Sequence, residues 1–294
     1  MAPANFRRLR FAPSPNGYLH LGHAYSALLN QTLALQLDAE LLLRMEDIDQ
    51  TRARARYVAG IYEDLKWLGL SWPQPVLQQS QRFDVYHAKL EWLIKQELVY
   101  RAFLSRKEIK EFAEKYKRDH GHDWSSDPDG APLYPDFCKQ QSHTLSDQRA
   151  SDGAPFTWRL DMQKAISYID QELSWSEYDL NFTKTVIRAD PSVWGDVIIA
   201  RKDTPTSYHL SVVLDDAAQD IDLVVRGMDL YHASSVHRLL QVVFDLPEPG
   251  YIHHKLILDK DGRKLSKSSR DTSIKSLRND RRQTLSQIKQ TLGF

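Results

Sequence analysis

The stretch that most restricts the fold of this chain is RFAPSPNGYLHLGHAYSALLN, at residues 10–30. Leu9 and Phe11 alternate with arginines, which predicts a short strand, and the prolines that follow predict a turn that ends it. From Leu21 onward, apolar residues recur at the spacing of one helical face, at Ala24, Tyr25, Leu28, Leu29 and Leu33. The sequence therefore predicts a strand, a tight turn and a helix in direct succession.

The same alternation of buried strand and amphipathic helix recurs along the chain. A second buried strand, ending in carboxylates, is predicted by AELLLRMEDID, and a second helix by the apolar positions within residues 57–68. Farther along, GDVIIAR and DLVVRGMDL predict strands on either side of a helix in SYHLSVVLDDAAQ. Strands that alternate with helices favour a parallel α/β sheet.

The middle of the chain lacks this pattern and is rich in Gly, Pro, Ser and Asp, as in HGHDWSSDPDGAPLYPDFC. We expect residues 1–100 to form the first half of the sheet domain, 101–185 a connective insertion, and 186–246 the second half. Residues 247–294 are expected to carry a lysine-rich loop and a helical C-terminal segment.

Composition limits the partners and the compartment. Lys plus Arg and Asp plus Glu are equal at 39 each, so contact with nucleic acid must come from a local patch. A single cysteine, Cys138, excludes an internal disulfide and fits a reducing compartment. The N-terminus lacks the apolar core of a signal peptide, and no apolar run has the length of a membrane span. We therefore expect a soluble, cytoplasmic protein with no membrane partner.

Two histidines, His20 and His23, stand one turn apart at the start of the first predicted helix. Imidazoles can donate hydrogen bonds to phosphate oxygens, and a helix N-terminus adds backbone donors and a partial positive charge. Gly22 between them would let a ligand approach the backbone. The alternative is that both are ordinary helix-surface histidines.

A second candidate site is the stretch DKDGRKLSKSSRD near the C-terminus. Lys264 and Lys267 flank Ser266, which offers point charges and a hydroxyl suited to a polyphosphate. The alternative is a solvated basic loop. The sequence lacks the Gly-x-x-x-x-Gly-Lys-Ser/Thr motif of P-loop nucleotidases.

Together, FAPSPNGYLHLGH and KLSKS resemble the two signature motifs of class I aminoacyl-tRNA synthetases, in the glutamate-specific form. The resemblance continues through LLLRMEDID, DLKWLGLSW, QSQRFDVY, GDVIIAR, SYHLSVVLDD, VVRGMDL and YIHHKLILDKDGRKLSKS, and it covers residues 8–270 in order apart from the middle section. It implies a Rossmann-type, doubly wound parallel sheet that carries an α+β insertion and is followed by a short helical segment.

The resemblance also implies activation of L-glutamate as its adenylate, with ATP and Mg²⁺ and without a protein nucleophile. It assigns catalytic roles to His20, His23, Lys264 and Lys267. It implies a glutamate pocket formed by Arg10, Phe11, Ala12, Pro13, Ser14, Glu46, Tyr208 and Arg226, with Glu46 binding the α-amino group. It implies an ATP site formed by His20, Gly22, His23, Asp229, Lys264, Ser266 and Lys267.

The chemistry of the residue types agrees with these roles. Arg10 and Arg226 are suited to bidentate capture of carboxylates, and adenylate formation depends on positioning and on charge stabilisation. The alternatives are structural: Glu46 and Asp47 could be a cap at the end of a strand, and Tyr208 a half-buried packing residue.

Within that class, the short C-terminal part resembles the glutamyl-Q tRNA(Asp) synthetase family. The resemblance implies transfer of glutamate to the queuosine base of tRNA(Asp), with no anticodon-binding domain and no obligate protein partner. Two alternatives stay open. One is a truncated or unusual glutamyl-tRNA synthetase that acts on a tRNA 3′ end or another acceptor. The other is an inactive paralogue that binds tRNA or nucleotide.

The chain departs from the zinc site that the family often carries in the insertion. Ala102 and Leu104 stand where that pattern has cysteines, while Tyr134 and Cys138 match it. A tetrahedral site cannot close on what remains, and His120 and His122 read as solvated loop residues. We expect no zinc in the insertion and assign no residue of the chain as a metal ligand. Packing should hold the insertion instead, through an apolar cluster that includes Phe103, Leu104, Phe112 and Phe137.

Overall fold

The computed structural model describes residues 6–140, 143–201, 204–258, 273–279 and 284–294, apart from the side chains of Cys138, Gln140 and His143. A seven-stranded sheet has the order β3-β2-β1-β9-β10-β6-β7. Its strands are β1 (Arg8–Phe11), β2 (Glu40–Met45), β3 (Leu77–Gln78), β6 (Ser174–Tyr178), β7 (Lys184–Arg188), β9 (Leu223–Gly227) and β10 (Gly250–His254). A three-stranded sheet consists of β4 (Val99–Ala102), β5 (Thr157–Leu160) and β8 (Ile198–Arg201).

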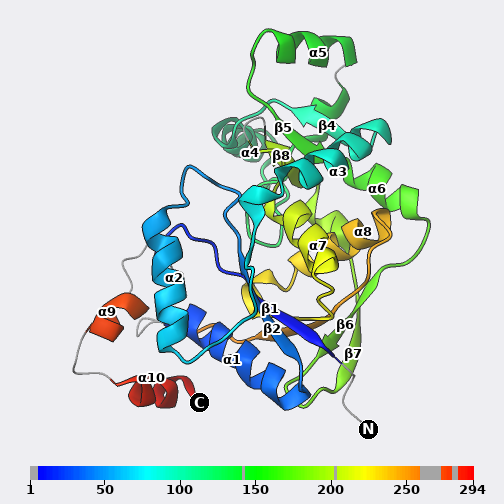
Figure 1. Cartoon of the computed structure of the whole chain (residues 1–294). Helices are drawn as coiled ribbons and strands as arrows, with labels where there is room; N and C mark the ends of the chain where they lie inside the picture. The colour runs from blue at the N-terminus through cyan, green and yellow to red at the C-terminus, as the bar shows by residue number, and fades with distance from the viewer. Residues whose placement is uncertain (1–5, 141–142, 202–203, 259–272, 280–283) are drawn as a thin grey trace.

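Helices surround both sheets (Figure 1). The α-helices are α1 (Leu21–Leu37), α2 (Ala55–Trp67), α3 (Phe83–Lys95), α4 (Arg106–His120), α5 (His143–Ser151), α6 (Met162–Ile169), α7 (Tyr208–Ala218), α8 (Ala233–Val243), α9 (Ile274–Asn279) and α10 (Leu285–Leu292). Short 3₁₀ helices are η1 (Gln79–Gln81), η2 (Asp136–Gln140), η3 (Pro191–Trp194) and η4 (Met228–Leu230).

Alternation of side chains along the central strands gives the large sheet two buried faces. In β9, Leu223 and Val225 pack in one apolar cluster with α1 and α2, whereas Val224 packs in the other with α7 and α8. In β10, Ile252 and Tyr251 divide in the same way. Because successive residues of a strand point to opposite faces, a strand that is apolar throughout requires helices on both sides. The predicted doubly wound α/β sheet is confirmed, with β7 added antiparallel to β6 at one edge.

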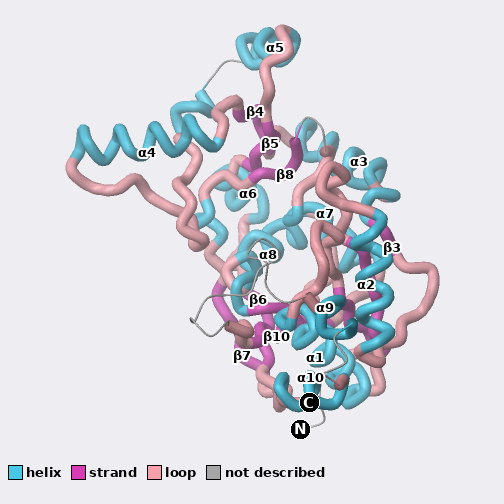
Figure 2. The backbone as a smooth tube through the Cα atoms, turned by 90° about the vertical axis from the view of Figure 1, so that its left-hand side faces the viewer, coloured by secondary structure: helices cyan, strands magenta, loops and turns pink. Residues whose placement is uncertain are grey.

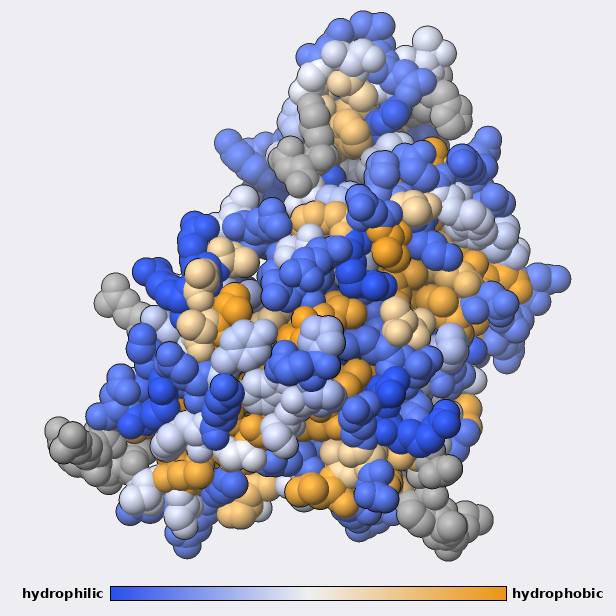
Figure 3. All heavy atoms as spheres, in the orientation of Figure 1, coloured by the Kyte–Doolittle hydropathy of each residue, from blue (hydrophilic) through white to orange (hydrophobic). Residues whose placement is uncertain are grey.

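The three-stranded sheet lies at one end of the molecule with α4 and α5, at the top of Figure 1. Figure 2 shows α4 projecting sideways from this end, away from the large sheet. The face seen in Figure 3 is mostly hydrophilic, with apolar side chains scattered between the polar ones. None of the helices that the structure describes is both long enough and apolar enough to span a lipid bilayer.

Strand pairing does not follow the predicted segment boundaries. β6 falls in the expected insertion, 101–185, yet it pairs with β10 in the large sheet. β8 falls in the expected second half, 186–246, yet it pairs with β5 in the small sheet. Asp196, just before β8, explains the second case because its carboxylate accepts hydrogen bonds from Tyr100 Oη at 2.7 Å and Met162 N at 3.0 Å. These contacts tie β8 to the small sheet, and the division into four segments stays a prediction.

An apolar cluster occupies the part of the insertion where cysteines were considered. Ala102 is 2% exposed and packs with Ile109 and Tyr134, and Leu104 lies against them. The Leu104 backbone N–H donates to Tyr134 Oη at 3.3 Å. Among the described residues, no group of three or more His, Cys, Asp or Glu side chains is placed to hold a metal ion.

The aromatic residues expected in this cluster separate into two groups. Phe112 and Phe137 contact each other with ring centroids 5.4 Å apart. Phe112 is not among the side chains packed against the cluster of Ala102, Ile109 and Tyr134, and Phe137 is 56% exposed, so the expectation was wrong for both. It was also wrong for Phe103, whose ring packs 5.8 Å from Phe156 and lies 4.2 Å from the Arg149 guanidinium carbon. Residues that alternate at the end of a strand point to opposite sides, which places Phe103 away from its two neighbours in the cluster.

The C-terminal helices α9 and α10 pack on the face of the large sheet that α1 and α2 cover. Leu277, Ile288 and Leu292 join that apolar cluster, and the Ile274 backbone N–H donates to Leu19 O at 2.7 Å. The preceding segment, 259–272, contains Lys264, Ser266 and Lys267 and lies outside the described residues. Their predicted roles stay predictions.

We expect purified protein to contain no stoichiometric zinc, because apolar side chains stand at two of the four ligand positions. A metal-bound domain loses folding free energy to a chelator, whereas an apolar cluster does not. The melting temperature and the activity should therefore be insensitive to a zinc chelator once Mg²⁺ is supplied, and Cys138→Ser should match the wild type. Nearly one zinc per chain, lost together with stability on chelation, would show that Cys138 recruits other ligands.

Candidate active site

A cavity of about 620 Å³ lies at the carboxyl ends of β1, β2, β9 and β10. Strand order reverses between β1 and β9, and ligands of open α/β sheets sit at such a reversal. The cavity is lined by every predicted site residue that the structure describes, namely Arg10, Phe11, Ala12, Pro13, Ser14, His20, Gly22, His23, Glu46, Tyr208, Arg226 and Asp229. Residues far apart in the sequence therefore share one pocket, while Lys264, Ser266 and Lys267 lie outside the described residues.

His20 and His23 cap the N-terminus of α1 through their ring nitrogens. The Gly22 backbone N–H donates to His20 Nδ1 at 3.1 Å, and the His20 backbone N–H donates to His23 Nδ1 at 3.2 Å. Because each Nδ1 is an acceptor, each neutral ring carries its proton on Nε2. The two histidines therefore stabilise the helix start and also present N–H donors of the kind that phosphate oxygens accept.

The structure gives Gly22 a role in addition to the expected one, which stays a prediction. A Cβ at this position would lie 3.0 Å from His20 Cε1 and 3.1 Å from His20 Nδ1. The missing side chain thus makes room for the His20 ring, whereas the sequence alone suggested room for a ligand. Both effects keep the start of α1 accessible from the pocket.

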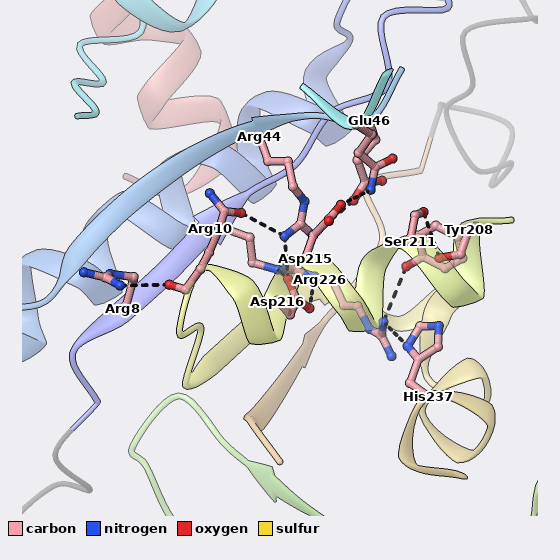
Figure 4. A network of polar contacts seen from close by, with 12 residues as sticks. Arg8, Arg10, Arg44, Glu46, Tyr208, Ser211, Asp215, Asp216, Arg226 and His237 are labelled. Carbon is pink, nitrogen blue, oxygen red and sulfur yellow. Dashed lines mark hydrogen bonds and ion pairs between the residues drawn. The ribbon is translucent and has the colours of Figure 1, made fainter. Parts of the chain in front are cut away.

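A buried charge network includes Arg10 and Glu46, two of the residues expected to bind glutamate (Figure 4). Arg10, from β1, donates to the Asp216 carboxylate from Nε at 2.9 Å and from Nη2 at 3.3 Å. Arg44, from β2, donates from Nη1 to Asp216 Oδ1 at 2.7 Å and from Nη2 to Glu46 Oε1 at 3.2 Å. Arg10 is thus paired with a protein carboxylate, and Arg44 fixes the orientation of Glu46.

The two carboxylates of this network differ in their pKa. Burial raises the pKa of Glu46, and the nearby guanidinium groups of Arg44 and Arg10 offset this only in part. Burial would also raise the pKa of Asp216, but Arg10 and Arg44 outweigh it and lower that pKa below its ordinary value. Asp216 is therefore the permanent counter-ion, whereas a cation beside Glu46 would favour its ionised form.

Arg226, in β9, is a buried arginine whose direct hydrogen-bond partners, within the part of the chain that the structure describes, are all neutral groups. Its side chain donates to His253 Nε2 at 3.0 Å, Tyr208 Oη at 3.4 Å, His237 Nδ1 at 3.1 Å, Leu230 O at 3.1 Å and Ser234 Oγ at 2.8 Å. The residue is 5% exposed. Glu177 is separated from it by His253, whose Nδ1 lies 2.9 Å from Glu177 Oε2. A buried guanidinium in a pocket without a carboxylate in direct contact favours an anionic ligand.

The histidines around Arg226 are held in the neutral form. Burial, together with the adjacent Arg226, places the pKa of His237 well below its ordinary value and lowers the pKa of His209 to about 4. Burial also lowers the pKa of His253, although its hydrogen bond with Glu177 acts in the opposite direction. His237 Nδ1 accepts from Arg226, so its Nε2 donates to His209 Nδ1, 3.2 Å away.

Sequence reasoning assigned no role to several residues that organise this site. Arg44 and Asp216 each left a local signal: one arginine inside the apolar run LLLRM, and an acidic pair inside the apolar helix VVLDDAA. A charge within an otherwise buried element indicates a buried partner. His237 and His253 left no such signal, because only the fold brings α8 and β10 to Arg226.

Comparisons with known proteins identify the family of this chain. Residues 7–291 match the family described as tRNA synthetases class I (E and Q), catalytic domain. A protein of Rhodobacter capsulatus named Glutamyl-Q tRNA(Asp) synthetase is 39% identical, over 92% of this chain and 94% of its own length. A protein of the same name from Synechococcus sp. strain CC9605 is 34% identical, over 92% of this chain and 77% of its own length.

Solved structures share the fold. A glutamate tRNA ligase from Elizabethkingia meningosepticum, in complex with its amino acid, superposes with a TM-score of 0.69 and 24% identity. The superposition covers 89% of this chain and 52% of the ligase. The chain spans about half the length of the glutamate–tRNA ligases that it matches.

We expect Asp216→Asn to lower the free energy of unfolding by about 3–5 kcal/mol, because it leaves two buried guanidinium groups without their shared carboxylate. Denaturation in urea measures the change. Asp220→Asn is the matched control, since the Asp220 side chain is exposed and only pairs with Arg8 at 3.3 Å; it should cost no more than about 1 kcal/mol. Equal losses in the two variants would contradict the assignment.

The stability difference between the wild type and Asp216→Asn should also depend on pH. The pKa of Asp216 is lower in the folded chain than in the unfolded chain. Its contribution to stability is therefore complete above the unfolded pKa and is lost as the pH falls through the folded pKa. The stability difference between wild type and Asp216→Asn should be largest near neutral pH and should narrow in acid.

Proposed function

Because the chain belongs to the catalytic-domain family of class I tRNA synthetases for glutamate and glutamine, we propose that it is an ATP-dependent ligase that activates L-glutamate. In this step the α-carboxylate of glutamate attacks the α-phosphate of ATP, which forms glutamyl-adenylate and releases pyrophosphate. A hydroxyl of the queuosine base in the anticodon of tRNA(Asp) then takes the glutamyl group, and AMP leaves. The relatives from R. capsulatus and Synechococcus sp. that are named Glutamyl-Q tRNA(Asp) synthetase support this choice of acceptor. Use of ATP and tRNA places the proposed reaction in the cytoplasm.

The observation that carries the proposal is the environment of Arg226. Its guanidinium lines the pocket, is buried, and has only neutral groups in direct contact. The longest of its hydrogen bonds is the one to Tyr208 Oη, at 3.4 Å. We expect the side-chain carboxylate of glutamate to replace that contact, with the Tyr208 hydroxyl then donating to the same carboxylate.

The opposite side of the pocket suits the other end of the amino acid. Glu46 lines the pocket and is oriented by Arg44. An α-ammonium group beside Glu46 would compensate the burial that raises the pKa of Glu46. Arg10 lines the pocket as well, and its bidentate pair with Asp216 holds the guanidinium in place.

The start of α1 suits the phosphates of ATP. His20 and His23 line the pocket as Nε2–H donors, and the helix N-terminus adds partial positive charge. We expect Lys264 and Lys267 to stabilise the charge that develops on the triphosphate. Among the described residues no cluster of side chains is arranged as a metal site, so Mg²⁺ would enter with the phosphate oxygens of ATP as its ligands.

Product mapping tests the acceptor. The protein is incubated with labelled glutamate, ATP, Mg²⁺ and tRNA(Asp) that either contains or lacks queuosine, and the tRNA is then digested with nucleases. We expect label on the queuosine nucleoside, and only with the modified tRNA. Label on the 3′-terminal nucleoside would instead indicate a glutamyl-tRNA synthetase of unusual form. Absence of any activated glutamate would indicate a binding paralogue.

The variant Arg226→Gln tests whether glutamate is the amino acid that the protein activates. Loss of the charged fork should lower kcat/KM for glutamate in ATP–pyrophosphate exchange by about 100-fold or more, and should reduce discrimination against glutamine. Arg238→Gln is the matched control, because Arg238 pairs with Glu248 at 3.2 Å outside the pocket. Wild-type selectivity in the Arg226 variant would show that this arginine faces something other than the side chain of the substrate.

A further inference from the structure

Three arginines at alternating positions follow the carboxylates that end β2. Arg52, Arg54 and Arg56 occupy the stretch TRARARY, which leads into α2, and all three are exposed. They belong to a chain whose positive and negative residues are equal in number. A cluster of one sign in such a chain is a local excess of charge.

Among the described residues, no carboxylate lies within ion-pair distance of the three guanidinium groups, although the Arg52 backbone N–H donates to Asp49 Oδ1 at 3.2 Å. Arg54 Nη1 lies 3.4 Å from Ala53 O, and Arg56 Nη2 donates to Tyr57 Oη at 3.1 Å. Several other arginines are paired, for example Arg8 with Glu40 at 2.9 Å and Arg82 with Asp215 at 2.8 Å. Like charges that lie close together repel, and an external anion would relieve that repulsion.

The cluster begins at the mouth of the pocket. Arg52 lines the pocket. The Arg54 backbone N–H donates to Pro15 O at 3.2 Å, which fixes the cluster beside the turn that follows β1. The Arg56 guanidinium carbon lies 4.8 Å from the centre of the Tyr57 ring, and this cation–π contact orients the fork.

A fourth cation, Lys275 in α9, is linked to these arginines through two aromatic rings. The Tyr57 ring packs edge-on against Tyr18, with centroids 5.0 Å apart. Lys275, in α9, donates to Tyr18 Oη at 3.0 Å and lies 4.5 Å from the centre of that ring. Contacts through Tyr57 and Tyr18 thus connect Arg56 with Lys275. We call Arg52, Arg54, Arg56 and Lys275 the cationic strip, and Arg52 is its member that lines the pocket.

We propose that this strip binds the sugar–phosphate backbone of the tRNA next to the nucleotide that enters the pocket. The inference rests on the proposed function, because an acceptor nucleotide must approach the activated glutamate through the pocket mouth, where Arg52 stands. Guanidinium forks match phosphate oxygens in geometry and charge. Backbone contacts of this kind position an RNA without reading its sequence.

Binding measured over a range of salt concentrations tests the strip. The double variant Arg54→Gln, Arg56→Gln is compared with the wild type, using fluorescence anisotropy of a labelled tRNA(Asp) transcript that lacks queuosine. Each lost phosphate contact should weaken binding by about fivefold at 0.15 M salt and reduce the slope of log K against log salt by about 0.7–0.9. We therefore expect roughly twentyfold weaker binding for the double variant.

Arg188→Gln is the matched control. Arg188 is an exposed arginine at the end of β7, and β7 lies on the opposite side of the molecule from α2 in Figure 1. This variant should bind the transcript as the wild type does. Thermal melting checks that all variants are folded, which we expect because the Arg54 side chain makes no cap hydrogen bond to α2.

ATP–pyrophosphate exchange with glutamate separates the two proposals. The double variant should keep the exchange rate of the wild type, since neither Arg54 nor Arg56 lines the pocket. If the double variant kept the wild-type affinity and salt slope, the proposal that the strip binds tRNA would be wrong. It would also be wrong if Arg188→Gln lost as much affinity for the transcript as the double variant. A wild-type protein that binds the transcript but fails to activate glutamate would overturn the proposed function while leaving the strip supported.

Discussion

The arrangement of Arg10 and Glu46 in the pocket depends on the carboxylate of Asp216. It accepts hydrogen bonds from Arg10 and Arg44, so one side chain of α7 fixes the functional ends of β1 and β2. Removing these charges from water is costly, and buried ion pairs are weak evidence for stability on their own. Their effect here is geometric: Arg44 is fully buried, and it orients Glu46 through Nη2 while Asp216 and Gln219 hold its Nη1. A pocket for a small amino acid needs that precision, because an error of 1 Å in position is costly for catalysis.

The positive charge of Arg10 is balanced by a carboxylate in direct contact, whereas the described groups that contact Arg226 are neutral. Both arginines are buried and both line the pocket. Arg10 has a carboxylate in bidentate contact, whereas Arg226 has neutral imidazole, hydroxyl and carbonyl partners. The neutral state of His237 and His253 follows from their burial and from the proximity of the guanidinium. The site is thus rigid before any ligand arrives, and the remaining electrostatic demand is for an anion.

Structural and chemical roles coincide at the start of α1. In a sequence, helix-surface histidines and phosphate-binding histidines are alternatives, and the capping geometry is compatible with both. His20 and His23 accept backbone N–H groups at Nδ1, which satisfies donors that a helix N-terminus leaves unpaired and fixes the proton on Nε2. Gly22 belongs to the same device, because a side chain there would collide with the His20 ring. The conformation that stabilises the helix also sets the donor pattern of the pocket.

The sequence by itself determined the local elements and the motifs. Strand, turn and helix at residues 8–37, the parallel α/β class, and a set of site residues that proves to line one cavity all follow from short-range periodicity and from the resemblance to a synthetase family. Only the tertiary structure decided which sheet received β6 and β8, on which side Phe103 packs, and which acid pairs with Arg44. Asp216 is 172 residues from Arg44 in the chain. Local pattern sets the type of an element, whereas pairing across such separations depends on how the buried faces and charges of distant elements meet.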